Sequence, residues 1–205
     1  MQTYVPTVCV LKSYDYKRRH NMTNIVFDLK NTGNPINKVW NFGYNTCHAQ
    51  LLLRDDLPLQ IKKSKESGFK YIRFHNIFSE AVGVYTENEA GEAIYNFENF
   101  DKIFDTVIKN GYLPFMEISF CQEAMKKSDK TIMFYKASTS IPAYYEKWDK
   151  LIEKMVSHII ERYGIECAKR WYFEVWNEPD LIFFDGDMKD YFELYDNTVL
   201  TIKKV

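Results

Sequence analysis

The sequence predicts an α/β fold in which four successive strand–helix units form a parallel sheet, after a short N-terminal β segment. Three features of the 205 residues predict it. Apolar stretches of strand length alternate with longer amphipathic stretches that end in glycine. The strongest strand signal, residues 171–179, is bulky and largely apolar at both parities, as expected of a strand covered on both faces. Long segments follow the second and third predicted strands, where α/β folds carry functional loops.

Residues 1–38 differ in character from the rest of the chain. Apolar stretches at residues 5–11 and 25–29 predict two short strands, and the polar, basic residues 14–20 between them are expected to form a solvated loop. The turn-forming sequence Asn-Thr-Gly-Asn-Pro at residues 31–35 marks a boundary. We therefore expect a β hairpin or sheet fragment that packs outside the main fold.

The first two strand–helix units occupy the next part of the chain. The first strand is predicted at residues 39–44, and its helix begins near Asp56 and ends at Gly68. The second strand is predicted at residues 69–75. After a long polar connection, its helix is predicted at about residues 98–109.

The third and fourth units complete the chain. The third strand is predicted at residues 112–119, and a long loop at residues 120–143 leads to a helix at residues 144–163. The fourth strand is the apolar stretch at residues 171–179, and the last helix is predicted from about Lys189 to the end. Both long loops follow the carboxyl ends of strands, so they are expected on the same side as the end of the fourth strand.

The fourth strand ends in a polar pair, Asn177 and Glu178, before Pro179. Pro179 cannot donate a ladder hydrogen bond and is predicted to hold Glu178 in an extended conformation at the strand end. Beside Trp176, Glu178 is expected to lose hydration, which favours its acid form and suits a general acid. Strict alternation turns only one of Asn177 and Glu178 inward, so the strand must distort if both contact a substrate. The alternative is an exposed turn at a strand-to-loop junction.

On the second, third and fourth predicted strands, the alternation of side chains places ionisable groups on the non-aliphatic face. The residues concerned are Arg73, His75, Glu117, Glu174 and Glu178. If the aliphatic faces meet the helices, these side chains point at a common centre. An unpaired charge there would cost several kcal/mol, so we expect one connected network, which is typical of an active site.

Several of these residues have a structural alternative. Arg73 could simply neutralise Glu117 or Glu174, and His75 could be a core histidine. His48, just after the first predicted strand, is either a site residue or a loop histidine. Glu117, Glu174 and Trp176 are predicted to support the site without taking part in the chemistry. No spacing of ligand residues suggests a metal, and no cofactor is expected.

The motif Phe-Glu-Val-Trp-Asn-Glu-Pro at residues 173–179 resembles the fourth-strand motif of retaining glycoside hydrolases with (β/α)8 barrels, above all the β-xylosidases of glycoside hydrolase family 39. Tyr-Ile-Arg-Phe-His at residues 71–75 and Pro-Phe-Met-Glu at residues 114–117 extend the resemblance in order and spacing. It implies that residues 39–205 are the first half of such a barrel, which usually takes about 250 residues. It also implies that residues 1–38 belong to an accessory β-domain.

The resemblance also implies roles for individual residues. In that family the Glu of Asn-Glu-Pro is the general acid/base and the preceding Asn binds the sugar's 2-hydroxyl, so these roles fall on Glu178 and Asn177. Arg73 and His75 would line the sugar subsite. The family's nucleophile is a Glu on the seventh strand, beyond the four predicted units, and Glu174 is better placed as a supporting group.

The predicted function is that of a retaining, β-xylosidase-like hydrolase that removes terminal β-linked xylose from xylo-oligosaccharides in xylan breakdown. Its expected partner is a β-xyloside or related oligosaccharide. Without the nucleophile strand, the chain alone is expected to be inactive. The open edges of a half-barrel are expected to cause homo-oligomerisation or aggregation unless the C-terminal half is supplied.

Other function classes receive less support. A non-catalytic sugar-binding sensor domain of a regulatory protein would keep the pocket without needing the acid Glu178, and no feature favours a purely structural fragment. The formal net charge of -1 gives no drive toward nucleic acid or anionic membranes. No apolar run is long enough to span a bilayer, and we find no signal peptide. The four cysteines are far apart, so a reducing, cytoplasmic location is expected.

Overall fold

The computed structural model describes residues 10–11, 25–26 and 33–205. The chain divides into two compact units, Met1–Val39 and Trp40–Val205. In the first unit, strands β1 (Val10–Leu11) and β2 (Ile25–Val26) pair antiparallel. The remainder of the predicted hairpin, including its loop, lies outside the described residues.

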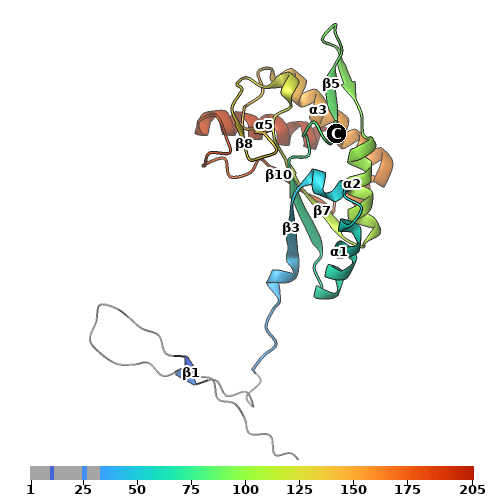
Figure 1. The fold of residues 1–205 in the computed structure, drawn as a ribbon, viewed down its shortest axis with the longest axis vertical. Coiled ribbons are helices and arrows are strands. Elements are labelled where there is room, and N and C mark those ends of the chain that lie inside the picture. Colours follow the sequence, from blue (N-terminus) through green and yellow to red (C-terminus); the bar gives the residue numbers. More distant parts are fainter. Residues whose placement is uncertain (1–9, 12–24, 27–32) are drawn as a thin grey trace, which may run out of the picture. The chain divides into compact units, whose positions relative to one another are not determined.

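The second unit is built on a four-stranded parallel sheet in the order β10-β7-β4-β3 (Figure 1). Its strands are β3 (Gly43–His48), β4 (Tyr71–His75), β7 (Leu113–Ile118) and β10 (Tyr172–Val175). Helical segments connect consecutive strands of this sheet, and each strand after β3 pairs in parallel with the strand that precedes it in the sheet. The strands of a (β/α)8 barrel are arranged in the same way. The predicted fold class, a partial barrel of four strand–helix units, is confirmed.

The helices that connect and follow these strands are α1 (Leu57–Ser64), α2 (Glu98–Lys109), α3 (Tyr145–Tyr163), α4 (Ile165–Ala168) and α5 (Met188–Lys204). Short 3-10 helices occur at η1 (Val39–Phe42), η2 (Ala49–Leu53), η3 (Lys65–Ser67) and η4 (Glu123–Met125). The helical stretch after β3 ends at Gly68, whose φ of 80° is left-handed and suits a glycine. Among the described residues, none of these helices combines the length and apolar character needed to cross a membrane.

The first strand begins later than the sequence predicts. Residues 39–42 form the 3-10 helix η1, and β3 starts at Gly43. The apolar residues that suggested a strand, Val39 and Trp40, are exposed. A Cβ at Gly43 would lie 2.8 Å from the carbonyl oxygen of Tyr71, so a glycine allows the two backbones to approach at the point where β3 pairs with β4.

Both long loops contain a hairpin that the sequence did not predict. Strands β5 (Tyr85–Glu87) and β6 (Ala93–Tyr95) pair in the loop after β4. Strands β8 (Thr131–Ile132) and β9 (Ala137–Ser138) pair in the loop after β7. Both loops therefore have internal backbone pairing at the carboxyl end of the sheet, where a ligand site is expected.

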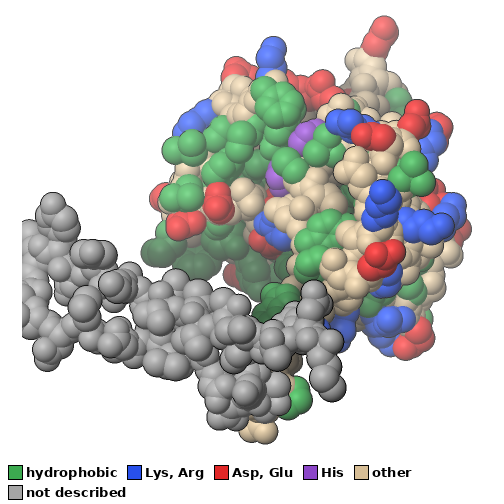
Figure 2. All heavy atoms as spheres, turned by 60° about the horizontal axis from the view of Figure 1, so that its bottom comes forward, with side chains coloured by type: hydrophobic (Ala, Val, Ile, Leu, Met, Phe, Trp, Pro, Cys, Tyr) green, Lys and Arg blue, Asp and Glu red, His purple; other side chains and the backbone are tan. Residues whose placement is uncertain are grey.

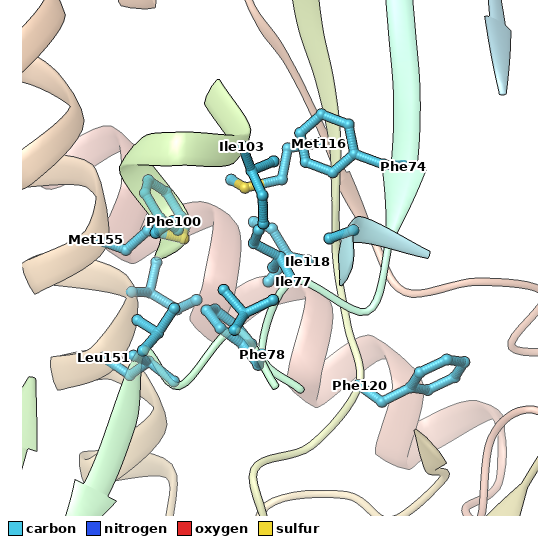
Figure 3. Close-up of a cluster of buried hydrophobic side chains, with 14 of the residues drawn as sticks. Phe74, Ile77, Phe78, Phe100, Ile103, Met116, Ile118, Phe120, Leu151 and Met155 are labelled. Carbon is cyan, nitrogen blue, oxygen red and sulfur yellow. The ribbon is translucent and has the colours of Figure 1, made fainter. Parts of the chain in front are cut away.

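The main core lies between one face of the sheet and the helices (Figure 3). Strands β4 and β7 contribute fully buried side chains at alternate positions, namely Ile72, Phe74, Met116 and Ile118. Helices α2 and α3 each contribute one buried stripe, which includes Phe100, Ile103, Leu151 and Met155. Burying such a side chain contributes about 1.5–3 kcal/mol. Because these positions face the helices, the opposite parity of each strand must face the barrel axis.

The strands at the two ends of the sheet, β3 and β10, each pair on one side only among the described residues. A closed barrel has no such edges, whereas a half-barrel leaves two. Phe42 and Tyr172, at the amino-terminal end of the sheet, are exposed aromatic residues. The described part of the chain thus presents both backbone edges and apolar surface.

Candidate active site

The inner face of the sheet, defined as the side chains of β4, β7 and β10 that point away from the helices, is layered. Its lowest layer is aromatic. The ring centroids of Tyr71 and Tyr172 lie 4.9 Å apart, those of Phe115 and Tyr172 lie 5.4 Å apart, and Phe42 stacks on Tyr71 at 4.8 Å. This layer forms an apolar floor beneath the charged residues of the same strands.

The next layer is an ion-pair network centred on Arg73. Its Nη2 atom donates to Oε2 of Glu117 at 2.6 Å and to Oε1 of Glu174 at 2.9 Å, and its Nε atom donates to Oε2 of Glu174 at 2.7 Å. The Ser119 hydroxyl donates to the other oxygen of Glu117. Three adjacent strands therefore contribute one side chain each to a single charged group. The fully buried carboxylate of Glu117 is compensated by two donors, as a buried charge must be.

This network has one guanidinium for two carboxylates, which affects the protonation of Glu117. Burial raises the pKa of Glu117 to about 7, and the neighbouring Glu174 charge adds to the rise, although the Ser119 hydroxyl and Arg73 oppose it. The site therefore contains a carboxyl group that exchanges its proton near neutral pH. Since both carboxylates are bound to Arg73, neither is free to approach a ligand carbon.

Asn177 joins the network at the carboxyl end of β10. Its Oδ1 atom accepts a hydrogen bond from Nη2 of Arg73 at 3.1 Å, which turns the side chain inward. The regular alternation of the strand ends after Val175, because Trp176 has a φ of 68° and Glu178 a φ of 46°. The strand is therefore distorted at the point where the sequence analysis expected a distortion if both Asn177 and Glu178 contact a substrate, and in this chain it turns Asn177 inward.

Trp176 is turned away from the inner face, although it shares the parity of Glu174. Its side chain is 1% exposed and packs edge-to-face against Phe120 and Phe184. The indole Nε1–H donates to the carbonyl oxygen of Phe183 at 2.9 Å. Trp176 therefore anchors the turn that carries Asn177, which is a supporting position.

Glu178 lies at the surface of the described chain. The prediction that Pro179 holds it extended is wrong, because its left-handed backbone opens a turn that is closed by a hydrogen bond from Leu181 N–H to the Glu178 carbonyl oxygen at 3.0 Å. Its side chain makes no hydrogen bond or ion pair with another described residue. The described residues do not bury Glu178, so they do not supply the desolvation expected from its neighbour Trp176.

His48 and His75 form a second group at the carboxyl end of the sheet. They are opposite each other in the register of β3 and β4, and their ring centroids lie 6.5 Å apart. His75 Nε2 shares a hydrogen bond of 3.0 Å with the hydroxyl of Tyr135, whose ring lies 4.4 Å from that of His48. His48 is thus the last residue of β3 and not part of a loop. Tyr135 was missed by the sequence analysis, and the only signal was an aromatic pair in a long loop after a strand.

Both histidines favour the neutral form. Burial, together with the charge of Arg73 and the neighbouring His48, lowers the pKa of His75 to about 4. Burial also lowers the pKa of His48. Figure 2 shows histidine side chains in a hollow beside hydrophobic ones. Neutral imidazoles donate and accept hydrogen bonds without attracting anions, which suits the recognition of hydroxyl groups.

The structure therefore separates the predicted site residues into groups. Arg73, Glu117, Glu174 and Asn177 are in direct contact, whereas His48 and His75 contact each other through Tyr135. Glu178 stands apart from both groups at the rim. Within residues 33–205, no three His, Cys, Asp or Glu side chains are grouped so that they could hold a metal ion.

Comparisons with known proteins agree on one family. The model of the family "Glycosyl hydrolases family 39" matches residues 23–205. A β-xylosidase of Caldicellulosiruptor saccharolyticus is 42% identical over 173 residues, covering 83% of this chain and 36% of that protein. A β-xylosidase of Geobacillus stearothermophilus is 40% identical over 174 residues, covering 82% of this chain and 34% of that protein. The crystal structure of a monomeric β-xylosidase from Caulobacter crescentus CB15 matches with a TM-score of 0.79 and 38% identity, covering 86% of this chain and 36% of that one.

Proposed function

The chain belongs to glycosyl hydrolases family 39, and from this membership we propose that it supplies the acid/base part of a retaining, β-xylosidase-like active site. The chain spans about a third of the length of the curated relatives it matches, 36% and 34%. The activity of the whole protein on terminal β-linked xylose is therefore part of the proposal. The proposed partner is a β-xyloside or a related oligosaccharide.

One observation carries the proposal: Arg73 holds Asn177 inward at the strand end, one residue before Glu178. Because the Oδ1 atom of Asn177 accepts from Arg73, its NH2 group remains free to donate to a sugar hydroxyl. A sugar bound in this way places its glycosidic bond near the rim residue Glu178. The neutral His48 and His75 are positioned to hydrogen-bond other hydroxyls of the same ring.

In the proposed reaction, Glu178 donates its proton to the glycosidic oxygen as the bond to the leaving group breaks. A retaining enzyme needs a second carboxylate about 5–5.5 Å away to attack the sugar carbon from the opposite side. Glu178 then removes a proton from the water that releases the sugar. In the enzymes that the motif resembles, the nucleophile is a Glu on the seventh strand, outside this chain. Glu117 and Glu174 are bound to Arg73 and are better suited to fix Asn177.

The test uses a protein in which this chain is joined to a complete barrel. Glu178→Gln is expected to lower kcat/KM on xylobiose, which reports the cleavage step, by about 10²–10⁴, since a positioned acid contributes that much. The loss should be smaller on an aryl xyloside, whose leaving group needs little protonation. Glu66→Gln, at an exposed position away from the inner face, is the matched control and should leave both rates unchanged.

Two outcomes would contradict the assignment. Equal losses on both substrates would mean that Glu178 does not act as a proton donor to the leaving group. Binding of xylose by the complete barrel without any turnover would favour the sensor alternative. The 205-residue chain alone should show no hydrolysis in either case.

A further inference from the structure

A separate cavity of about 430 Å³ lies between the loops that follow β4 and β7. This volume is within the range of about 300–1,000 Å³ that is usual for small-molecule sites. The side chains that matter in its wall are Gln50, Asn76, Phe78, Tyr135, Lys136 and Ser138. None of the carboxylates of the candidate active site lines it. Tyr135 forms the boundary, since its hydroxyl contacts His75.

One buried polar atom in this wall has no partner among the described residues: the hydroxyl oxygen of Ser138, a residue that is 6% exposed. Asn76, which is 4% exposed, contributes its side-chain amide to the same wall. A buried polar group without a partner costs about 1–3 kcal/mol. A guest that supplies hydrogen bonds inside the cavity would recover this cost.

The backbone holds Asn76 firmly in place at the cavity. Asn76 directly follows His75 and has a left-handed φ of 59°, which Asn tolerates better than most residues. Its backbone N–H donates to the Ser119 hydroxyl at 3.3 Å, and its carbonyl oxygen accepts from Ser79 N–H at 3.2 Å. With both backbone groups bonded, the amide side chain is left for the cavity.

The charge of the wall favours an uncharged guest. Its charged side chains are two lysines, Lys126 and Lys136, and two glutamates, Glu80 and Glu123, so their formal charges cancel. The rest of the wall includes amide and hydroxyl groups and the rings of Phe78 and Tyr135. Hydrogen-bonding groups beside an aromatic wall are what a sugar ring requires, since it has polar hydroxyls on its edge and apolar C–H groups on its faces.

We propose that this cavity, here called the loop pocket, binds one uncharged pyranose-sized sugar unit through Asn76, Ser138 and the ring of Tyr135. The loop pocket needs no proton transfer and is independent of the acid role of Glu178. Through Tyr135 it adjoins the His48–His75 pair, so a sugar unit there lies beside the proposed hydrolytic site.

The test is a saturation-transfer NMR titration of the 205-residue chain with D-xylose and xylobiose. Ala81 is an exposed residue in the wall of the loop pocket, so Ala81→Trp is expected to obstruct the entrance and weaken binding at least tenfold. Ser138→Ala removes one hydrogen bond and should weaken binding about three- to tenfold. Ala143→Trp, at an exposed position outside the wall, is the matched control and should bind as the unaltered chain does.

A further variant, Asn177→Ala, separates the loop pocket from the hydrolytic site. It removes a group of the hydrolytic site and should leave intact the binding that Ala81→Trp obstructs. If Asn177→Ala abolishes binding and Ala81→Trp does not, the sugar occupies the hydrolytic site and the loop pocket proposal is overturned, while the proposed function stands. Absence of saturable binding to the unaltered chain also overturns it, because the cavity then holds water only.

Discussion

Replacing Arg73 by Met tests whether the charged layer is a single interdependent network. Met has an unbranched side chain that fills part of the same space, but it lacks the guanidinium donors to Glu117, Glu174 and Asn177. Glu117 would then retain only the Ser119 hydroxyl as a partner. We expect a large loss of stability that depends on pH, because the penalty arises only while Glu117 is ionised.

The magnitude follows from burial. The side chain of Glu117 is 0% exposed and that of Arg73 is 21% exposed, so removing one partner leaves a buried charge, which costs about 3–5 kcal/mol. The pKa of Glu117 in the folded chain is about 7, above its ordinary value of 4.5. The stability that Glu117 contributes is therefore present below pH 4.5 and is lost as the pH rises through 7. At pH 5, where Glu117 is protonated, the loss should be smaller, because it then comes from the hydrogen bonds of Arg73 alone, each worth about 0.5–1.5 kcal/mol.

The assay is urea unfolding at pH 5 and pH 8, followed by tryptophan fluorescence and far-ultraviolet circular dichroism. Arg54→Met is the control, because Arg54 also binds a carboxylate through two nitrogens, at 2.9 Å each, but its side chain and that of Asp56 are 60% and 53% exposed. It should change stability little at either pH. A loss for Arg73→Met that is the same at both pH values, or no larger than that of the control, would refute the reasoning.

Two further predictions concern His75 and the open sheet. The pKa of His75 in the folded chain is about 4, below its ordinary value of 6.5. The stability that His75 contributes above pH 6.5 should therefore be lost as the pH falls through 4. The free energy of unfolding should fall by up to about 1.4 kcal/mol for each pH unit in this range. His75→Gln should remove this dependence in urea unfolding, and a gap between the two proteins that stays constant with pH would contradict it. The chain should self-associate in sedimentation velocity through its edges and exposed aromatics, and Phe42→Ser with Tyr172→Ser should weaken this; a monomer at every concentration would count against it.

The helices were the most predictable part of the fold. Helix α2 has the predicted bounds, Glu98–Lys109, and α3 starts one residue later than predicted, at Tyr145. Both are long amphipathic stretches that end within two residues of a glycine. Their length repeats the period of 3.6 residues often enough to be unambiguous. Short strands lack this repetition. The apolar Val39 and Trp40 suggested a strand, but they are exposed, and only tertiary packing decides that β3 begins at Gly43.

The candidate site was predictable where it depends on sheet geometry. Arg73, Glu117 and Glu174 lie on three adjacent parallel strands, so parity alone brings them to one face. Tyr135 could not be predicted, because its position depends on how the β8–β9 hairpin folds back toward His75. His75 makes its hydrogen bond to Tyr135 and none to the arginine network, whereas parity alone placed His75 and Arg73 in one group.

The end of β10 departs most from strand alternation. Regular alternation would turn the indole of Trp176 inward, above Glu174, and Asn177 outward. Left-handed conformations at Trp176 and Glu178 reverse this, at a cost of the order of 1–3 kcal/mol each. Burial of the indole against Phe120, and its hydrogen bond to the Phe183 carbonyl, offset that cost. The alternation of side chains along β10 therefore ends at the point where the strand presents Asn177 to Arg73. Departures from local sequence rules are expected at functional sites, where residues are placed for binding or catalysis at some cost in stability.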